Sequence, residues 1–256
     1  MEMILISGYG LTAASWGPLL AIWGEPAPTA VAVELPGHGS RVISESEDPA
    51  DPRVWVEGLD RALGEATEPV LVIAFSMSTA ALAHRLAASG TRGIAGCVLL
   101  GGVPGPEQFS REYQSLAAGI LTGRADADAS LVELYATGPT ARSLVAADLA
   151  RLGLPARQAA ADLPPSPSMS ISVPTLVIYG ADDAVTRPPT RQRLTSLGAD
   201  VELAMISGAG HAVHLDAPDT VAKTIQRWLS SSGLARTPSP PAPAEPHRGP
   251  DVIGPR

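Results

Sequence analysis

The stretch from Val70 to His84, VLVIAFSMSTAALAH, constrains the fold more than any other part of the chain. It begins with apolar, mostly β-branched residues, which favour a buried strand, and continues from Met77 with Ala- and Leu-rich residues that favour a helix. A single serine, Ser76, lies between the two segments. The stretch therefore predicts a strand, a sharp turn carrying a serine, and a helix. An ordinary turn whose serine caps the helix would have the same pattern.

The turn around Ser76 is similar to the pattern Gly-x-Ser-x-Gly, in which a strained backbone lifts a serine hydroxyl above the edge of a sheet. Ala74 and Ser78 occupy the positions of the two glycines. Both side chains are small, so a sharp turn can still be accommodated. We expect these replacements to tighten the turn and to narrow the neighbouring pocket, or to accompany a specialised chemistry.

Strands and helices are expected to alternate along the rest of the chain. The other expected strands lie at residues 3–7, 30–35, 94–101, 173–179 and 200–206. The expected helices include residues 52–66, 77–89, 188–197 and 217–231. This alternation predicts an α/β fold with right-handed crossovers and a mostly parallel sheet of about six strands, flanked by helices. Ligands of such sheets bind beyond the carboxyl ends of the strands.

The same pattern divides the chain into three parts. Residues 1–103 and 173–233 are predicted to form the α/β core. Residues 104–172 are too long for a plain connection, and their apolar spacing indicates several helices, which we interpret as a cap inserted after the fourth strand. Residues 234–256 are rich in Pro, Ala and Ser and are predicted to be a disordered tail.

Ser76 has two candidate partners, each directly after a predicted strand. A serine hydroxyl becomes a strong nucleophile when a base takes its proton and a third group orients that base. The turn Gly180-Ala181-Asp182-Asp183 offers an acid, and Gly210-His211 offers a base. Asp183 is the preferred acid and Asp182 the alternative, because the turn geometry is inferred from pattern alone.

The remaining histidines are expected to have other roles. His38 lies in a turn and is placed near the entrance of the site, whereas His84 and His214 are interpreted as structural or surface residues and His247 lies in the tail. His211 and His214 are not expected to bind a metal, because no further ligands at metal spacing accompany them. No cofactor is expected.

Taken together, these features resemble the α/β-hydrolase superfamily over residues 3–232. The motifs that carry the resemblance are the loop Ser7-Gly8-Tyr9-Gly10, the turn Glu34-Leu35-Pro36-Gly37-His38-Gly39, the acid turn ending at Asp183, and Gly210-His211. The resemblance implies that Ser76 is the nucleophile, His211 the general base and Asp183 the orienting acid. Serine, acid and histidine also follow one another in the order used by that fold.

The resemblance further implies an oxyanion hole and a substrate-binding wall. The backbone N–H groups of Tyr9 and Met77 would form the oxyanion hole, and Gly8, Tyr9, Phe75 and Met77 would contact the substrate. Ser7 stands where the family usually has histidine. Because the oxyanion contact is made by backbone, we expect catalysis to tolerate this change.

The implied activity is hydrolysis of a carboxylic ester through an acyl-enzyme intermediate. Residues 134–142, LYATGPTAR, look like the pimeloyl-acyl-carrier-protein methyl ester esterases of biotin synthesis, which implies an ester bound to a carrier protein. The cap arginines are expected to be solvated, and Arg142, Arg151 and Arg157 to offer a local basic patch. The alternatives are a thioesterase or another acyl-processing hydrolase of secondary metabolism, and a non-catalytic ligand-binding member of the fold.

Composition argues against several classes of partner, and the partner that the resemblance implies is a small-molecule ester, free or bound to a carrier protein. The formal net charge of −8 argues against a broad basic surface for nucleic acid or an anionic membrane. No apolar run is long enough to span a bilayer, and Glu2 stands where a secretion signal would carry positive charge, so a cytoplasmic location is expected. Cys97, the single cysteine, lies in an apolar run and is expected to be buried and without redox or metal function. The oligomeric state is left open.

Overall fold

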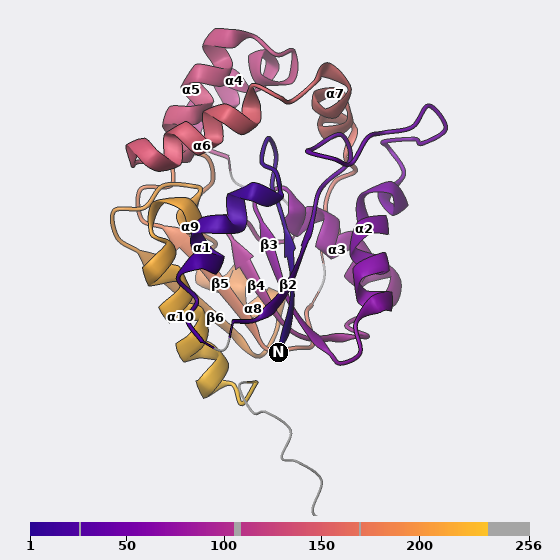
Figure 1. Ribbon diagram of the computed structural model, residues 1–256, viewed down its shortest axis with the longest axis vertical. Coiled ribbons are helices and arrows are strands. Elements are labelled where there is room, and N and C mark those ends of the chain that lie inside the picture. Colours follow the sequence, from indigo (N-terminus) through magenta and orange to yellow (C-terminus); the bar gives the residue numbers. More distant parts are fainter. Residues whose placement is uncertain (26, 105–108, 169, 235–256) are drawn as a thin grey trace, which may run out of the picture.

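The computed structural model describes residues 1–25, 27–104, 109–168 and 170–234. In these residues six strands form one parallel sheet with the spatial order β2-β1-β3-β4-β5-β6 (Figure 1). The strands are β1 (Glu2–Ile6), β2 (Thr29–Val33), β3 (Val70–Phe75), β4 (Ile94–Leu100), β5 (Thr175–Gly180) and β6 (Val201–Ile206). The predicted α/β architecture is confirmed, and every predicted strand is present with its ends shifted by at most two residues.

Helices cover both faces of the sheet. One face packs against α2 (Pro52–Glu65), α3 (Ser78–Ser89) and α8 (Arg191–Leu197). The other face packs against the 3₁₀ turn η1 (Ala13–Trp16), α1 (Gly17–Ala21), α9 (Val213–Asp216) and α10 (Pro218–Ser231). None of the described helices is both long and apolar enough to cross a lipid bilayer.

Strand β3 lies inside the sheet and is buried along its whole length. Successive side chains of a strand point to opposite faces, so Ile73 and Phe75 join the core beneath α1 and α10, whereas Val72 and Ala74 join the core beneath α2 and α3. Burying an aliphatic side chain of this size contributes roughly 1.5–3 kcal/mol. The continuous apolar run that ends at Phe75 thus fixes the position of Ser76 at the carboxyl edge of the sheet.

Four helices are inserted between β4 and β5, and we call residues 109–168 the insertion. They are α4 (Arg111–Leu121), α5 (Ala125–Tyr135), α6 (Pro139–Leu149) and α7 (Leu154–Asp162). Figure 1 shows them above the carboxyl ends of the strands. The expectation of several helices in this region is confirmed, while their status as a separate cap domain stays a prediction. The predicted tail, 234–256, lies outside the described residues except for its first residue.

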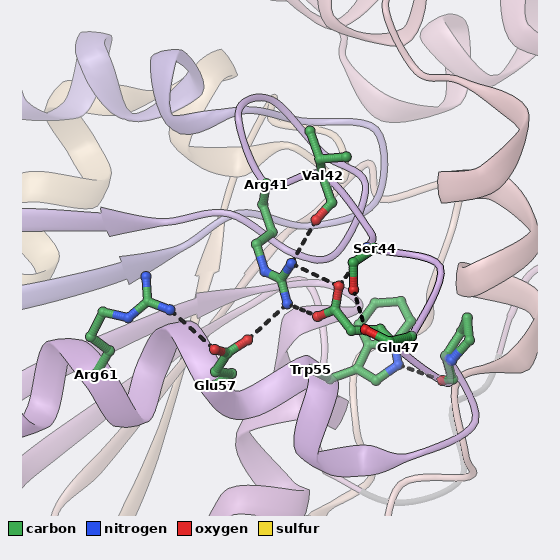
Figure 2. A network of polar contacts seen from close by, with 9 residues as sticks. Arg41, Val42, Ser44, Glu47, Trp55, Glu57 and Arg61 are labelled. Carbon is green, nitrogen blue, oxygen red and sulfur yellow. Dashed lines mark hydrogen bonds and ion pairs between the residues drawn. The ribbon is translucent and has the colours of Figure 1, made fainter.

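The loop between β2 and α2 is fastened by Arg41, as Figure 2 shows. The Arg41 guanidinium pairs with Glu47 and with Glu57, 2.8 Å away, and donates a hydrogen bond to the carbonyl oxygen of Val42 at 2.6 Å. These bonds to Arg41 and the Ser44 amide lower the pKa of Glu47 to about 2. Each ion pair of this half-exposed kind contributes about 0–1 kcal/mol, so the network orders the loop more than it stabilises the fold.

Candidate active site

The turn at Ser76 holds the backbone in a strained conformation. Ser76 has a φ of +53°, and it is the one non-glycine residue with positive φ in the described part of the chain. A left-handed backbone is unfavourable for a residue with a Cβ and is retained where the surrounding structure enforces it. Here the amide of Ser76 donates to the carbonyl oxygen of Leu100 at 2.8 Å, at the end of β4. Ser76 therefore projects from a sharp strand-to-helix turn, as predicted.

Ser78 fits one of the expected glycine positions because its hydroxyl is bonded inside the turn. The hydroxyl accepts a hydrogen bond from the amide of Phe75 at 2.8 Å and lies 2.9 Å from the carbonyl oxygens of Phe75 and Ile6. Both Ala74 and Ser78 are fully buried. Neither lines the cavity beside Ser76, so neither narrows this pocket by direct contact, and an indirect effect through the turn stays a prediction.

Ser76, His211 and Asp183 lie in one chain of hydrogen bonds. The Nε2 atom of His211 is 2.7 Å from the Oγ atom of Ser76, and its Nδ1 atom is 2.9 Å from the Oδ2 atom of Asp183. These residues come from the ends of β3, β6 and β5, which meet at one edge of the sheet. Asp182, the alternative acid, is exposed. The geometry thus selects Asp183 over Asp182 as the partner of His211.

The surroundings of Asp183 keep its carboxyl group ionised. Burial by itself would raise its pKa, but the charge and hydrogen bond of His211 and the amides of Val185 and Thr186 outweigh burial and hold the pKa below its usual value. The two amides donate to Oδ1 at 2.8 and 2.9 Å, and the Thr186 hydroxyl donates to Oδ2 at 3.0 Å. Asp183 is therefore a fixed, negatively charged acceptor.

This environment assigns the proton positions on His211. An ionised carboxylate can only accept hydrogen bonds, so Nδ1 carries the proton that faces Asp183. In the neutral form of the ring, the lone pair of Nε2 then faces the hydroxyl of Ser76. An imidazole in this tautomer can accept the proton of a serine hydroxyl as that oxygen attacks an electrophile. The arrangement thus has the geometry required for nucleophilic chemistry at Ser76.

His214 is also buried beside the site, but its contacts are packing contacts with aromatic rings. Its ring stacks on Trp16 at 4.6 Å and packs against Phe75 at 4.7 Å. Neither ring nitrogen has a hydrogen-bond partner among the described residues. Burial, followed by the charge of His211, lowers the pKa of His214 to about 3, so the ring is neutral near pH 7. The expectation that His214 is structural fits these contacts.

The other histidines lie away from Ser76 or outside the described residues. His38 is buried rather than open to the entrance, with Nδ1 2.9 Å from the carbonyl oxygen of Pro36. His84 lies on α3 and contacts the carbonyl oxygen of Pro164 at 3.2 Å. His247 falls outside the described residues. Only His211 among the described histidines contacts Ser76 by a hydrogen bond.

The end of β5 touches the histidine loop, which we define as residues 207–212. A Cβ atom at Gly180 would overlap the carbonyl oxygens of Ala209 and Gly210. The amide of Ala181 donates to Ile206 and the amide of Asp182 to Ala209, at 2.8 and 3.0 Å. Glycine at position 180 therefore lets the acid turn and the histidine loop pack directly against each other.

The loop after β1, residues 7–12, is held close to the turn at Ser76, residues 74–78, which we call the elbow. A Cβ atom at Gly8 would lie 2.7 Å from the ring of Phe75, so this position also depends on glycine. The hydroxyl of Ser7 donates to the carbonyl oxygen of Thr12 at 3.0 Å and accepts from the indole N–H of Trp16 at 3.1 Å. Ser7 thus supports the loop from within, and Tyr9 is one of the residues that line the cavity beside Ser76.

A cavity of about 580 Å³ opens at Ser76. In the described residues its wall contains no charged side chain, and the insertion provides most of it. Its lining residues are Tyr9, Ser76, Met77, Ala80, Phe109, Tyr113, Gln114, Ala117, Leu121, Tyr135, Ala160, Ala161, Leu163, Pro164, Pro165, Ser166 and Val185. The cavity is therefore suited to an apolar, uncharged group of a bound molecule.

Two of the four predicted substrate-contacting residues line this cavity. Tyr9 and Met77 are part of its wall, whereas Gly8 and Phe75 are not among its lining residues. Phe75 is fully buried, with its ring 5.1 Å from that of His211 and 6.3 Å from that of Tyr135. Phe75 thus packs against the ring of His211, and a direct contact of Gly8 or Phe75 with substrate stays a prediction.

Arg157 is buried, which corrects the expectation that the insertion arginines are all solvated. Its side chain makes two 2.8 Å contacts with the carboxylate of Asp128 and donates to the carbonyl oxygen of Ile120 at 2.6 Å. Arg157 is 3% exposed, whereas Arg151 is exposed and Arg142 pairs with Glu133 at 2.8 Å. A surface patch of all three arginines is therefore ruled out, because Arg157 joins the helices of the insertion from inside.

Two residues at the site are not among the predicted site residues. Thr186 binds Asp183 three residues before it in the chain, and this Asp-x-x-Thr spacing is a local pattern typical of side chains that bond to their own turn. Tyr135, the last residue of α5, has its ring centroid 5.0 Å from that of His211. No local signal marks Tyr135, because its role depends on how the insertion packs on the core.

Comparison with known proteins places the chain in a family. A family model described as the alpha/beta hydrolase family matches residues 3–224. A search of curated proteins gave no match. Among solved structures, an esterase from Rhodococcus sp. ECU1013 is 20% identical with a TM-score of 0.81, covering 91% of this chain and 91% of that one.

Two further structures share the fold at low identity. An esterase from Exiguobacterium antarcticum is 14% identical with a TM-score of 0.76, covering 90% of this chain and 92% of that one. A bromoperoxidase from Bacillus anthracis is 17% identical with a TM-score of 0.73, covering 90% and 91%. At these identities the likeness establishes the fold alone, and activity is argued from the site. The family model matches most of this chain, which shows that the chain belongs to the alpha/beta hydrolase family.

Proposed function

We propose that the protein is a serine hydrolase that cleaves uncharged carboxylic esters. The observation that carries the proposal is the chain of hydrogen bonds from Ser76 through His211 to Asp183, with distances of 2.7 and 2.9 Å, beside a cavity whose described lining residues carry no charge. In this proposal Ser76 is the nucleophile, His211 the general base and Asp183 the group that orients it. The esterases among the structural neighbours agree with this activity.

The proposed reaction has two halves. The Oγ atom of Ser76 attacks the ester carbonyl carbon while Nε2 of His211 takes the hydroxyl proton. The tetrahedral intermediate then collapses, the bond to the leaving alcohol breaks, and His211 gives that alcohol its proton. Water then attacks the acyl-enzyme carbonyl carbon while His211 takes one of its protons. The bond between the acyl carbon and the Oγ atom of Ser76 breaks, His211 gives its proton to that oxygen, and the carboxylic acid leaves.

The backbone amides of Tyr9 and Met77 are the proposed oxyanion donors. Within the described residues, neither amide donates to a carbonyl oxygen of a loop or turn, and both residues line the cavity beside Ser76. A preorganised donor of this kind contributes roughly 3–4 kcal/mol to stabilising the transition state. Backbone donors also explain why Ser7 can stand in place of histidine without loss of the contact.

The wall of the cavity determines which part of an ester can be bound. An unpaired carboxylate transferred into an apolar site loses its hydration without gaining a partner, which is strongly unfavourable. The buried position of Arg157 also removes one of the three arginines expected to bind an acidic carrier protein. We therefore propose that the acyl group must be neutral. The more specific candidate stays the methyl ester of a pimeloyl group bound to a carrier protein.

A pair of p-nitrophenyl esters tests this preference. The matched substrates are the p-nitrophenyl ester of adipic acid with a free second carboxylate and the same compound with that carboxylate methylated. We expect kcat/KM to be at least about 100-fold higher for the methylated ester, because the anionic end must be desolvated on binding. Equal values for the two compounds would contradict binding of the acyl group in the cavity.

The same assay separates the alternative functions. A series of neutral p-nitrophenyl esters of increasing chain length gives the depth of the acyl site, and a thioester of the preferred acyl group distinguishes a thioesterase. A carrier-protein ester compared with its free methyl ester measures any contribution of the carrier. If none of the neutral esters is hydrolysed but one of them binds saturably, the non-catalytic alternative is favoured.

A further inference from the structure

Tyr135 connects the two loops that flank Ser76. It is the last residue of α5 and is 2% exposed. Its main-chain oxygen accepts a hydrogen bond from the amide of Ala212 at 2.7 Å, directly after His211. Its hydroxyl donates to the main-chain oxygen of Tyr9 at 3.1 Å. One residue of the insertion therefore binds both the histidine loop and the loop after β1.

The residues that follow Tyr135 are firmly attached to the histidine side of the site. The carboxylate of Asp216 in α9 accepts hydrogen bonds from the amides of Thr137 and Gly138 at 3.0 Å, and from the amide of Gly210 at 2.8 Å. The hydroxyl of Thr137 donates to the carbonyl oxygen of Gly208 at 3.0 Å. The end of α5 is thus anchored to the histidine loop by several bonds besides that of Ala212.

The loop after β1 needs such an anchor because its glycines allow the backbone many conformations. Tyr9 lies between Gly8 and Gly10, and Gly10 has a φ of +74°. Glycines on both sides leave the orientation of the Tyr9 peptide groups weakly determined by local structure. The bond from Tyr135 fixes the Tyr9 carbonyl, while the Tyr9 hydroxyl lies 3.4 Å from both Arg157 and the carbonyl oxygen of Ile120.

We infer that Tyr135 is a positioning residue, whose hydroxyl holds the Tyr9 amide in the direction needed to bind the oxyanion and whose main chain ties that loop to His211. The inference rests on the proposed function, in which the Tyr9 amide is an oxyanion donor. Tyr135 also lines the cavity, but its hydroxyl is bonded to the main-chain oxygen of Tyr9 and so acts through Tyr9. Its hydroxyl thereby sets the geometry of transition-state binding more than the affinity for substrate.

The substitution Tyr135→Phe tests the inference, because it removes the hydroxyl and keeps the ring and the main-chain oxygen. We expect kcat for a neutral p-nitrophenyl ester to fall roughly 10- to 100-fold while KM changes by less than about twofold. A trifluoromethyl ketone, whose adduct with serine places an oxyanion in the same position, is expected to bind more weakly by the same factor as the loss in kcat/KM. The affinity for the product acid is expected to stay unchanged.

Ser130→Ala is the matched control, since it removes a hydroxyl from the same helix whose bond, to the carbonyl oxygen of Asp126, stays within α5. Its kcat and its trifluoromethyl ketone affinity are expected to equal those of the wild type. If Tyr135→Phe also matches the wild type in both, the inference is wrong while the proposed function stands. A parallel loss in substrate, product and inhibitor affinity would point to a merely structural role and would equally overturn it.

Hydrogen exchange tests the inference even if the wild type hydrolyses no ester, an outcome that would overturn the proposed function. We expect the peptide spanning residues 7–16 to exchange at least about threefold faster in Tyr135→Phe than in the wild type, because a loop that loses an anchor opens more often. The β3 peptide, residues 70–75, serves as the internal reference. Equal exchange of the 7–16 peptide in both proteins would show that the Tyr135 hydroxyl does not position this loop.

Discussion

Replacing Ser76 with alanine is expected to lower kcat for ester hydrolysis by roughly 10⁵- to 10⁶-fold, with KM changed by only a few-fold. The oxygen atom removed is the one that lies 2.7 Å from Nε2 of His211. Without it no acyl-enzyme can form, and the remaining rate comes from water attacking an ester that is bound beside the oxyanion donors. The cavity wall is otherwise intact, so substrate affinity is largely kept.

Steady-state kinetics with the preferred neutral p-nitrophenyl ester measure this loss. Ser115→Ala is a suitable control, because the Ser115 hydroxyl is exposed and bonds to the carbonyl oxygen of Glu112 within α4. Its kcat should equal that of the wild type. A residual activity of Ser76→Ala above about 1% of the wild type would be incompatible with Ser76 as the nucleophile.

The substitution Gly180→Ala is expected to disrupt the site and to destabilise the fold. A Cβ atom at this position would overlap two main-chain oxygens of the histidine loop, which cannot move aside as a flexible side chain could. Overpacking of a tightly packed position costs about 1–3 kcal/mol and more when backbone must shift. Because that shift displaces His211 from Ser76, we expect kcat/KM to fall at least about 100-fold as well.

Urea unfolding followed by circular dichroism measures the stability change, and Gly64→Ala provides the matched control. Gly64 lies in α2, and a Cβ atom there would have no neighbour within 4 Å. Alanine is favoured over glycine inside a helix, so Gly64→Ala is expected to stabilise the protein by about 0.5–1 kcal/mol. A Gly180→Ala protein that unfolds at the same urea concentration as the wild type would contradict the close packing at this position.

The sheet and the partners of Ser76 could be predicted because their signals are local. The apolar run that ends at Phe75 marks β3 by composition, and Asp183 and His211 each follow such a run within five residues. Parallel strands bring their carboxyl ends to one edge, so residues from distant parts of the sequence meet there without further information. The choice between Asp182 and Asp183 needed the structure, because side-chain direction in a turn depends on its dihedral angles.

The packing of the insertion could not be predicted, because it depends on contacts between helices. The sequence presents Arg157 as one of five arginines in residues 104–172. Its burial results from the helices α4 to α7 coming together, which brings the Asp128 carboxylate and the carbonyl oxygen of Ile120 around one guanidinium. The bonds of Tyr135 to Tyr9 and Ala212 have the same origin, since they join segments more than 70 residues apart.

The elbow shows how a motif can depart from its pattern and keep its shape. Serine at position 78 is tolerated because its hydroxyl lies within hydrogen-bond distance of three main-chain groups. A sequence pattern records only that glycine is missing, not that a buried hydroxyl finds partners. The strained φ of +53° at Ser76 is therefore maintained by bonds from its neighbours, and not by the absence of side chains alone.

Labelling with a fluorophosphonate tests the central claim, the activated nucleophile at Ser76, most directly. The reagent phosphonylates a serine whose proton is taken by a neighbouring base, and it needs no knowledge of the natural substrate. The account predicts one adduct per chain in the intact mass spectrum of the wild type, mapped to Ser76 after digestion, and no adduct on Ser76→Ala. A wild-type protein that stays unlabelled, or an adduct that persists in Ser76→Ala, would contradict it.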